Sequence, residues 1–317
     1  MTKVLCKISI LPSLPLLSLV FLAFLGCNTM VSRFASRALN QVGEEIRPVA
    51  KKNTTPIRTE GGVSILWVGH ATVLIQIDDK VIITDPVFTK TVGMLGRRSI
   101  EPGLDPSSIS RLDVILISHL HFDHFSYGSL DMLPTQATLI VPPGGADYTP
   151  AFGFTEILEA KTWQTIEHDG LKITPVPVQH FGGRYGFDVL WGPERPYTGY
   201  IIEYKGTTIF FAGDTGYNPE LFKEIGCRYR IDVALLPIAP IEPRDFMKRI
   251  HTDPADALQV FEDVGAKIMI PMHYNTFFQG LEPEVGSART MMRQIIEERN
   301  LQERVKMLDI GEQIVLK

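Results

Sequence analysis

The chain has little cysteine, with three residues of this type among 317. Cys6 and Cys27 fall within the first 27 residues, so Cys227 is alone in the rest of the chain. A single thiol has no internal partner, which excludes a disulfide framework in the body of the protein. We expect Cys227 to be a small buried residue.

A basic excess is also missing. The chain has 31 Lys and Arg residues against 36 Asp and Glu, and its formal net charge is -5 at pH 7. A protein that binds along nucleic acid normally neutralises phosphates with a surplus of cations, so we expect no nucleic-acid partner. The 44% hydrophobic and 21% charged residues are ordinary for a globular chain, and no short repeat or low-complexity segment interrupts it.

Charge is absent from one long apolar run near the N-terminus. Lys3 and Lys7 begin the segment, and residues 8–26 are uncharged and rich in Leu, Ile, Val and Phe. A short positive region followed by such a run is typical of an export signal. Residues 24–27, Phe-Leu-Gly-Cys, are similar to the cleavage box of bacterial lipoproteins, although the Phe and the Leu depart from the usual pattern.

The segment therefore predicts lipidation of Cys27 and an exported, membrane-anchored lipoprotein of the cell envelope. Two acyl chains on this cysteine hold a protein stably on a bilayer. Two alternatives stay open. One is an uncleaved transmembrane anchor, for which the run is long enough although Pro12 and Pro15 weaken the helix. The other is simple secretion.

The rest of the chain divides into a membrane-proximal region and one large domain. Apolar residues recur every fourth position from Met30 to Ile46, which favours an amphipathic helix, and residues 47–60 have the Pro and Lys content of a spacer. We expect one domain over residues 61–317. Whether it forms a homodimer is left open.

Short strands and helices alternate along this domain. The strand predictions are residues 63–68, 73–77, 81–84, 114–117, 138–141, 171–178, 199–204, 207–212, 232–236 and 267–270. The helix predictions are residues 126–132, 219–226, 254–264 and 284–298, with Asp253 as an N-cap before Pro254. Because helices fall between strands, we predict a mixed α/β (α+β) fold in which helices flank two mixed β-sheets.

Histidine is scarce, yet it is concentrated in one place. Three of the eight histidines, His119, His121 and His124, lie beside Asp123 directly after an apolar strand. Neutral imidazole and carboxylate are good ligands for zinc and similar divalent ions. The alternative is a His-rich surface loop without a function. Such a loop would not explain why three of only eight histidines lie within six residues, so we predict a metal site.

Three further candidates follow predicted strands. They are His180, Asp214 and His273. Taken singly, a strand-end histidine is usually capped or exposed, and an aspartate between glycine and threonine usually makes a turn. The recurrence of the pattern within one chain favours a shared site.

These motifs resemble the metallo-β-lactamase superfamily. The HxHxDH run at 119–124 and the three later residues follow the order and rough spacing of that family's two-metal site. Residues 67–75, 211–217 and 241–254 are similar to the branch of N-acylphosphatidylethanolamine-hydrolysing phospholipase D and its bacterial relatives. The resemblance covers about residues 61–315 and implies a four-layer αββα sandwich with a catalytic role.

The resemblance also implies the ligand set for two divalent ions. One ion would be held by His119, His121 and His180 and the other by Asp123, His124 and His273, with Asp214 bridging the pair. Zinc is the expected metal, with iron or manganese as alternatives. Asp85 would support the ligands from behind, unless it is only a turn residue before Pro86. His70 fits a similar supporting role or a purely structural one.

Two such ions hold a water between them and lower its pKa from about 15.7 toward 7. The implied reaction is attack of that bridging hydroxide on phosphorus or a carbonyl carbon. Asp123 is the candidate for proton transfer. His251 is the candidate that protonates the leaving group or holds a phosphate oxygen.

We predict phosphodiester hydrolysis of N-acylphosphatidylethanolamine-type phospholipids, because of the 241–254 match and the membrane address. A lactone or carboxylic-ester hydrolase and a non-catalytic surface lipoprotein that binds metal or lipid are the alternatives. The aromatic segment 181–197 is either an apolar substrate wall or hairpin packing. Arg184 and Arg244 either meet a phosphate or are solvated.

Overall fold

The computed structural model describes residues 33, 36, 44–93, 96–159, 161–185, 188, 196–278, 280–281 and 286–316. The predicted export signal, Cys27 and nearly all of the predicted helix at 30–46 lie outside these residues. No helix in the described part of the chain is both long and apolar enough to cross a membrane.

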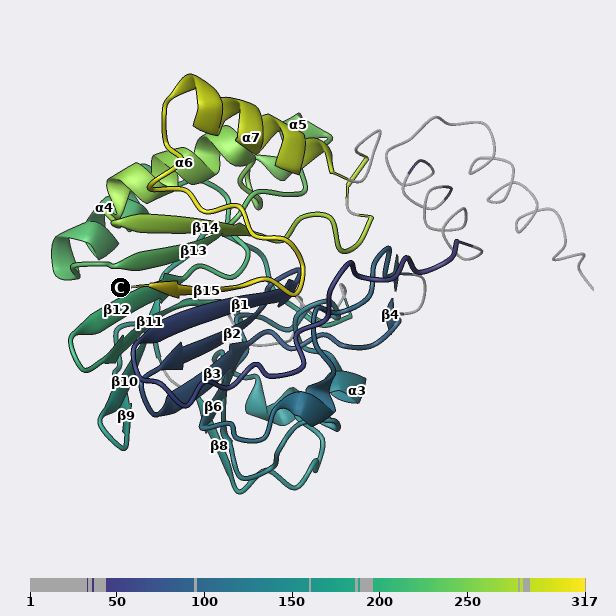
Figure 1. Cartoon of the computed structure of the whole chain (residues 1–317), viewed down its shortest axis with the longest axis vertical. Helices are drawn as coiled ribbons and strands as arrows, with labels where there is room; N and C mark the ends of the chain where they lie inside the picture. Colours follow the sequence, from purple (N-terminus) through teal and green to yellow (C-terminus); the bar gives the residue numbers. More distant parts are fainter. Residues whose placement is uncertain are drawn as a thin grey trace, which may run out of the picture.

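Two mixed β-sheets form the centre of the molecule (Figure 1). The first has the order β15 (Gln313–Leu316), β1 (Val63–Gly69), β2 (Thr72–Ile77), β3 (Lys80–Thr84), β6 (Val114–Leu116), β7 (Thr138–Val141) and β8 (Glu156–Glu159). The second has the order β14 (Ile268–Met272), β13 (Val233–Pro237), β12 (Thr207–Phe211), β11 (Gly199–Tyr204), β10 (Leu171–Val176) and β9 (Ile166–His168). A separate hairpin pairs β4 (Thr91–Val92) with β5 (Gly96–Arg97).

Helices cover the outer sides of the two sheets. Three of them, α4 (Pro219–Arg228), α6 (Pro254–Asp263) and α7 (Ser287–Glu298), lie together against the second sheet (Figure 1). The short helix α3 (Tyr127–Leu130) lies beside the first sheet, and α5 (Arg244–Met247) precedes α6. The described part of the chain also contains two 3₁₀ turns, η1 (Pro106–Ser108) and η2 (Ala146–Tyr148). The predicted arrangement of helices around two mixed sheets is confirmed.

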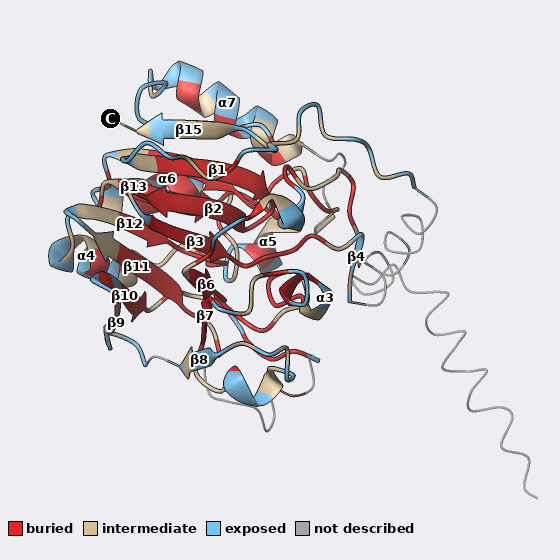
Figure 2. Cartoon of the chain, turned by 60° about the horizontal axis from the view of Figure 1, so that its bottom comes forward, coloured by how far each residue is buried: buried red, intermediate tan, exposed pale blue. Residues whose placement is uncertain are grey.

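The central strands of the first sheet are mainly apolar on both faces because each face meets a core. In β6, Val114 and Leu116 pack with the second sheet, whereas Ile115 packs with Phe125 and Leu130 on the α3 side. Successive side chains of a strand point to opposite faces, so an uninterrupted apolar run indicates a strand buried on both sides. Figure 2 shows the central strands in the colour of buried residues.

Several elements differ from the sequence predictions. The edge strands β8, β9 and β15 and the β4–β5 hairpin were not predicted, because their exposed or short sequences have no buried apolar run. Asp253 caps α6 as predicted, since its side chain accepts a hydrogen bond from the Asp256 N–H at 2.8 Å. The prediction that Cys227 is buried is wrong, because this residue lies on an exposed side of α4.

The segment predicted as a spacer is bound to the body of the molecule. The N–H of Arg47 donates to the carbonyl of Ser99 at 3.1 Å, and that of Asn53 donates to Gly103 at 2.7 Å. Gln313, in the edge strand β15, donates to the carbonyl of Pro56 at 2.8 Å. These contacts attach residues 47–58 to the domain, while the division of the chain at residue 60 stays a prediction.

Parallel pairing gathers the strand ends that carry polar residues. Strands β3, β6 and β7 are parallel in the first sheet, and β12, β13 and β14 are parallel in the second. The carboxyl ends of parallel strands meet at one edge of a sheet. The edges of the two sheets also meet, because the Tyr200 hydroxyl donates to the carbonyl of Ile117 and the Thr198 N–H donates to that of Ser118.

Candidate metal centre

The loop after β6 folds back on itself and directs its polar side chains to one place. The N–H groups of His124 and Phe125 both donate to the carbonyl of His121, at 3.1 and 2.8 Å. This turn brings His119, His121 and His124 against the residues that follow β12 and β14. All of the residues predicted as ligands, together with His70 and His251, are gathered there.

The first group consists of His119, His121 and His180. The Nδ1 atom of His121 lies 2.8 Å from His119 Nε2 and 3.4 Å from His180 Nε2. The outer nitrogens have other partners, since His119 Nδ1 contacts the Ser118 hydroxyl at 2.9 Å and His180 Nδ1 donates to the Ile250 carbonyl at 2.9 Å. The inner nitrogens therefore face one another with their lone pairs available to a cation.

The second group consists of Asp123, His124, His273 and His70. The Nε2 atoms of His124 and His273 are 3.2 Å apart, and His70 Nε2 lies 3.1 Å from an oxygen of Asp123. Each residue of this group offers a ligand atom within 4.8 Å of the others, as does each residue of the first group. His70 thus contacts the ligand candidate Asp123 directly, and its supporting role stays a prediction.

Asp214 lies between the two groups. Its Oδ2 atom is 3.2 Å from His124 Nε2 and 4.0 Å from His119 Nε2, and its Oδ1 atom is 2.9 Å from His273 Nε2. A carboxylate with contacts to both sets of imidazoles has the position of a bridging ligand. His251 approaches the same carboxylate, with Nδ1 3.6 Å from Oδ2.

Asp85 is buried behind the ligand candidates and uses both of its oxygens. Oδ1 accepts the Ser118 N–H at 2.6 Å, and Oδ2 accepts the Ser118 hydroxyl at 2.5 Å and contacts His124 Nδ1 at 2.7 Å. The last contact places the N–H of His124 toward Asp85 and leaves Nε2 free on the inner side. Such a carboxylate orients a metal-binding histidine and makes it a stronger ligand.

Burial keeps most of these imidazoles neutral. It lowers the pKa of His119 and His180 well below the ordinary value, and that of His121 is lowered for the same reason. Burial also lowers the pKa of His251 to about 4 and, with His273 nearby, that of His70 to about 3. A neutral imidazole offers a lone pair, so these groups suit a cation.

The carboxylates stay charged in spite of burial. Burial by itself raises the pKa of Asp123 and Asp214, but neighbouring histidines outweigh it and hold both values below the ordinary range. Burial also disfavours the charged form of His124, yet the surrounding aspartates raise its pKa well above the ordinary value. The cluster therefore combines imidazole nitrogens with buried negative charge, and this combination of donors fits divalent ions.

Three residues of the site have left-handed backbone angles that side chains other than glycine rarely adopt. The φ angles are 56° at His70, 34° at Asp85 and 71° at His273. Such conformations persist only where surrounding contacts hold them. At His70 the holding contacts are the Thr276 hydroxyl, which accepts its N–H at 2.7 Å, and the His273 N–H, which donates to its carbonyl at 3.0 Å.

The sequence analysis was wrong about Arg184, which is neither solvated nor placed to meet a phosphate. It is 5% exposed, and Nη1 donates to the carbonyls of Leu120 and Phe125 at 3.1 and 2.8 Å. Its guanidinium carbon lies 3.8 Å from the centre of the Tyr127 ring. Arg184 therefore fastens both ends of the turn that carries the histidine motif.

Arg244 is likewise bound by residues of the fold. Nη1 donates to the carbonyl of His251 at 3.0 Å, Nε pairs with Asp253 at 3.1 Å, and Nη2 pairs with Asp256. Its side chain is paired with these acids and 25% exposed, so the alternative of a solvated surface residue is wrong, while phosphate contact stays a prediction. The residue ties the backbone of His251 to the start of α6.

The predicted aromatic wall is described only in part. Phe181 is 44% exposed, and its ring centre lies 4.7 Å from that of His121. Tyr185 is 51% exposed beside Phe122. These rings border the histidine cluster, whereas Phe187 and Trp191 lie outside the described residues.

Two sheets with covering helices, and a histidine and aspartate cluster at the edge where they meet, are the features of a metal-binding protein. The comparisons with known proteins give the family. The family model described as the β-lactamase superfamily domain matches residues 80–274, and the chain belongs to this superfamily, in its metallo-β-lactamase form. It is a metal-dependent hydrolase of that superfamily.

Individual relatives agree with this assignment. The chain is 29% identical over 276 residues to N-acyl-phosphatidylethanolamine-hydrolyzing phospholipase D 1 of Caenorhabditis elegans, which covers 80% of this chain and 75% of that protein. It is also 29% identical over 248 residues to a UPF0173 metal-dependent hydrolase of Methanopyrus kandleri, covering 78% and 97%. Other curated relatives are longer, and the chain spans 47% to 59% of their length.

A solved structure supports the fold. The metallo hydrolase Igni18 of the archaeon Ignicoccus hospitalis superposes with a TM-score of 0.60 and 23% identity, covering 80% of this chain and 98% of that chain. At this identity the likeness concerns the fold alone.

Proposed function

We propose that the chain hydrolyses a phosphodiester bond of N-acylphosphatidylethanolamine-type phospholipids, as a phospholipase of the D type. The position of His251 carries this proposal. It belongs to the stretch 241–254, is not one of the predicted ligands, and approaches Asp214 at 3.6 Å, with His180 as a further neighbour in the cluster. The nematode relative is named as an enzyme of this type, which supports the choice of substrate.

The same proposal assigns the ligands. One ion would be held by His119, His121 and His180 and the other by Asp123, His124 and His273, with Asp214 as a ligand shared by the two. Zinc is the first choice for nitrogen and oxygen donors of this kind, and iron and manganese are the alternatives. Two such ions supply an activated water and neutralise charge on phosphate oxygens.

His251 is suited to bind a phosphate oxygen. Its Nδ1 atom has no hydrogen-bond partner among the described residues, and a neutral imidazole can donate one N–H. Asp123 stays ionised and accepts from His70, so it is the candidate for moving a proton. Phe181 and Tyr185 offer apolar contact to acyl chains at the border of the cluster.

A substrate panel tests the proposal. The purified chain is assayed against N-acylphosphatidylethanolamine, an aryl phosphodiester and an acyl-homoserine lactone, with and without chelator. We expect release of phosphatidic acid from the lipid, lost with chelator and restored by zinc. Turnover of the lactone alone would favour an ester hydrolase. Absence of any chelator-sensitive turnover would instead favour a non-catalytic lipoprotein that binds metal or lipid.

Substitution of His251 separates its role from metal binding. His251→Ala is expected to lower kcat by about 10²–10³-fold, the range for loss of one hydrogen-bond donor to a developing negative charge, with the metal content retained. His168→Ala is the matched control, because His168 lies on β9, away from the cluster. Full activity of His251→Ala would remove the residue from the mechanism.

We also propose that Cys27 is lipidated and anchors the protein on the cell envelope, beside its lipid substrate. The cleavage-box resemblance and the apolar run before it support this. Metabolic labelling with a clickable fatty acid is expected to mark the protein but not its Cys27→Ser variant. Membrane association of an unlabelled protein would favour the uncleaved anchor instead.

A further inference from the structure

A cavity of about 530 Å³ has no lining residue in common with the histidine cluster. Its wall comes from the β4–β5 hairpin, the segment around residues 101–106, the N-terminal residues near 45–52, and Met132 just after α3. Its volume lies in the range of small-molecule sites, roughly 300–1,000 Å³.

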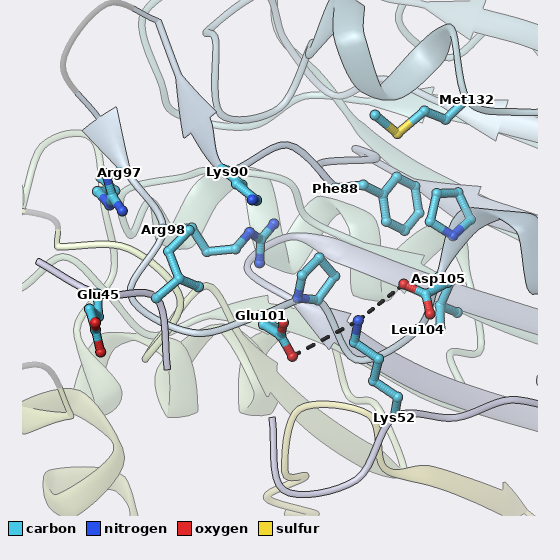
Figure 3. Close-up of a pocket in the computed structure, with 13 residues that line it drawn as sticks. Glu45, Lys52, Phe88, Lys90, Arg97, Arg98, Glu101, Leu104, Asp105 and Met132 are labelled. Atoms are coloured by element: carbon cyan, nitrogen blue, oxygen red, sulfur yellow. Dashed lines mark hydrogen bonds and ion pairs between the residues drawn. The ribbon is translucent and has the colours of Figure 1, made fainter. Parts of the chain in front are cut away.

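The two ends of the cavity differ in chemistry. Phe88, Leu104 and Met132 lie at one end, and Arg97, Arg98 and Lys90 lie toward the other (Figure 3). Met132 is 50% exposed, whereas Phe88 is 7% exposed. An apolar end next to a cationic end matches a molecule that has a hydrocarbon part and a negative head.

The wall carries three acids, Glu45, Glu101 and Asp105, against four cations, Lys52, Lys90, Arg97 and Arg98. Lys52 pairs with Asp105 at 3.0 Å and with Glu101 at 3.9 Å (Figure 3). Lys90 makes no ion pair within the described part of the chain, and its side chain is exposed toward the cavity. The wall therefore keeps a positive excess at the Lys90 end.

Arg98 adds a buried cation without a carboxylate partner in the described part of the chain. It is 2% exposed, and its guanidinium donates only to the carbonyls of Val87 and Thr89, while Nη1 has no partner there. Burial lowers its pKa to about 10, so it stays charged at neutral pH. A buried charge without a counter-charge is costly, and an anion in the adjoining cavity would offset part of that cost.

We propose that this cavity binds an amphiphile with a single carboxylate or phosphate head, the head beside Lys90 and Arg98 and the chain along Phe88, Leu104 and Met132. The site is separate from the proposed catalytic function. A free small anion leaves the apolar end unused, and a cationic amphiphile meets the uncompensated guanidinium.

Direct binding tests the proposal without any readout of activity. The full chain in phosphatidylcholine nanodiscs is titrated calorimetrically with octyl phosphate, octanoate, octyltrimethylammonium and inorganic phosphate, and protein-free nanodiscs give the background. We expect saturable binding of octyl phosphate, octanoate or both. The cation and inorganic phosphate are expected to bind at least tenfold more weakly.

Two variants place the ligand in the cavity. Lys90→Gln and Met132→Gln are each expected to weaken binding about fivefold or more, and both change exposed side chains that the fold does not need. Lys172→Gln on β10 is the matched control and is expected to bind like the parent chain. Equal binding by Lys90→Gln and Met132→Gln, or equal affinity for the cationic amphiphile or for inorganic phosphate, would overturn the proposal.

Discussion

At the scale of single residues, the site depends on side chains that fix other side chains. Asp85 has a ligand atom within 4.8 Å of those of His119 and His124, and both of its oxygens are engaged by Ser118 and His124. Burial raises its pKa, and His124 and Ser118 oppose this rise by binding the ionised form. Asp85 therefore stays ionised only because Ser118 and His124, the residues that it orients, bind its charged form.

Replacing Asp85 by Asn should weaken metal binding while the fold is kept. An amide cannot take the place of the charged acceptor opposite His124 Nδ1, so the imidazole loses its fixed orientation. Supporting residues of this kind are worth about 10–100-fold in metal affinity. Competition titration with a zinc chelator measures the effect, and Asp169→Asn in the exposed turn before β10 serves as the control. Unchanged zinc affinity in Asp85→Asn would show that His124 is oriented without it.

Arg244 acts through the backbone of His251. Its guanidinium joins the His251 carbonyl to Asp253 and Asp256. Arg244→Lys cannot make these contacts together, and a misplacement of about 1 Å costs on the order of 10²-fold in rate. We expect kcat to fall by about 10–100-fold, with KM and metal content nearly unchanged. Arg228→Lys, at an exposed i,i+4 pair in α4, is the control. A fall in metal content equal to the fall in kcat would instead assign Arg244 to the fold.

At the scale of elements, turns between strands hold the motif loop. Arg184 reaches that loop because its own turn is closed by Asp188. The Asp188 carboxylate accepts the N–H groups of Arg184 and Tyr185, at 2.7 and 2.8 Å, and the Tyr148 hydroxyl at 3.0 Å. Burial alone raises the pKa of Asp188, but these hydrogen bonds outweigh it and lower the value.

This turn makes a pH-dependent contribution to stability. Because the folded pKa of Asp188 is below its unfolded value, the contribution is present above about pH 4 and is lost as pH falls through the folded pKa. Asp188→Asn should lower the free energy of unfolding by about 1–3 kcal/mol at pH 7, and the difference should shrink toward pH 3. Urea denaturation of both proteins across this range measures it. A constant difference at all pH values would contradict the assignment.

Sequence patterns predicted the central elements and missed those at the edges. Strands such as β6 and β7 contain uninterrupted apolar runs, and α6 has a capping Asp before Pro254, so both kinds of signal are local. Strand β15 pairs with β1 from the far end of the chain, and nothing within its four residues records that pairing. The burial of Arg184 depends in the same way on distant aromatic rings.

At the scale of the whole molecule, the cluster joins the two sheets. His119, His121 and His124 follow strand β6 of the first sheet, whereas Asp214 and His273 follow strands β12 and β14 of the second. The scarcity of histidine and its position after strands indicated a metal site. That residues as distant as His70 and His273 come together follows from the parallel strand ends and from family resemblance, and no spacing in the sequence encodes it.

Metal binding should therefore stabilise the contact between the sheets as well as the reaction site. A ligand that binds only the folded state adds about 2.7 kcal/mol at a hundredfold excess over its Kd, which raises Tm by roughly 4–5 °C for a chain of this size. We expect Tm of the chelated protein to rise with zinc, and Asp214→Asn to lose most of the rise, because Asp214 contacts both groups. His168→Ala should keep the full rise. If Tm of the parent chain does not change with zinc, or if Asp214→Asn rises as far as the parent, the cluster does not hold the sheets together through metal.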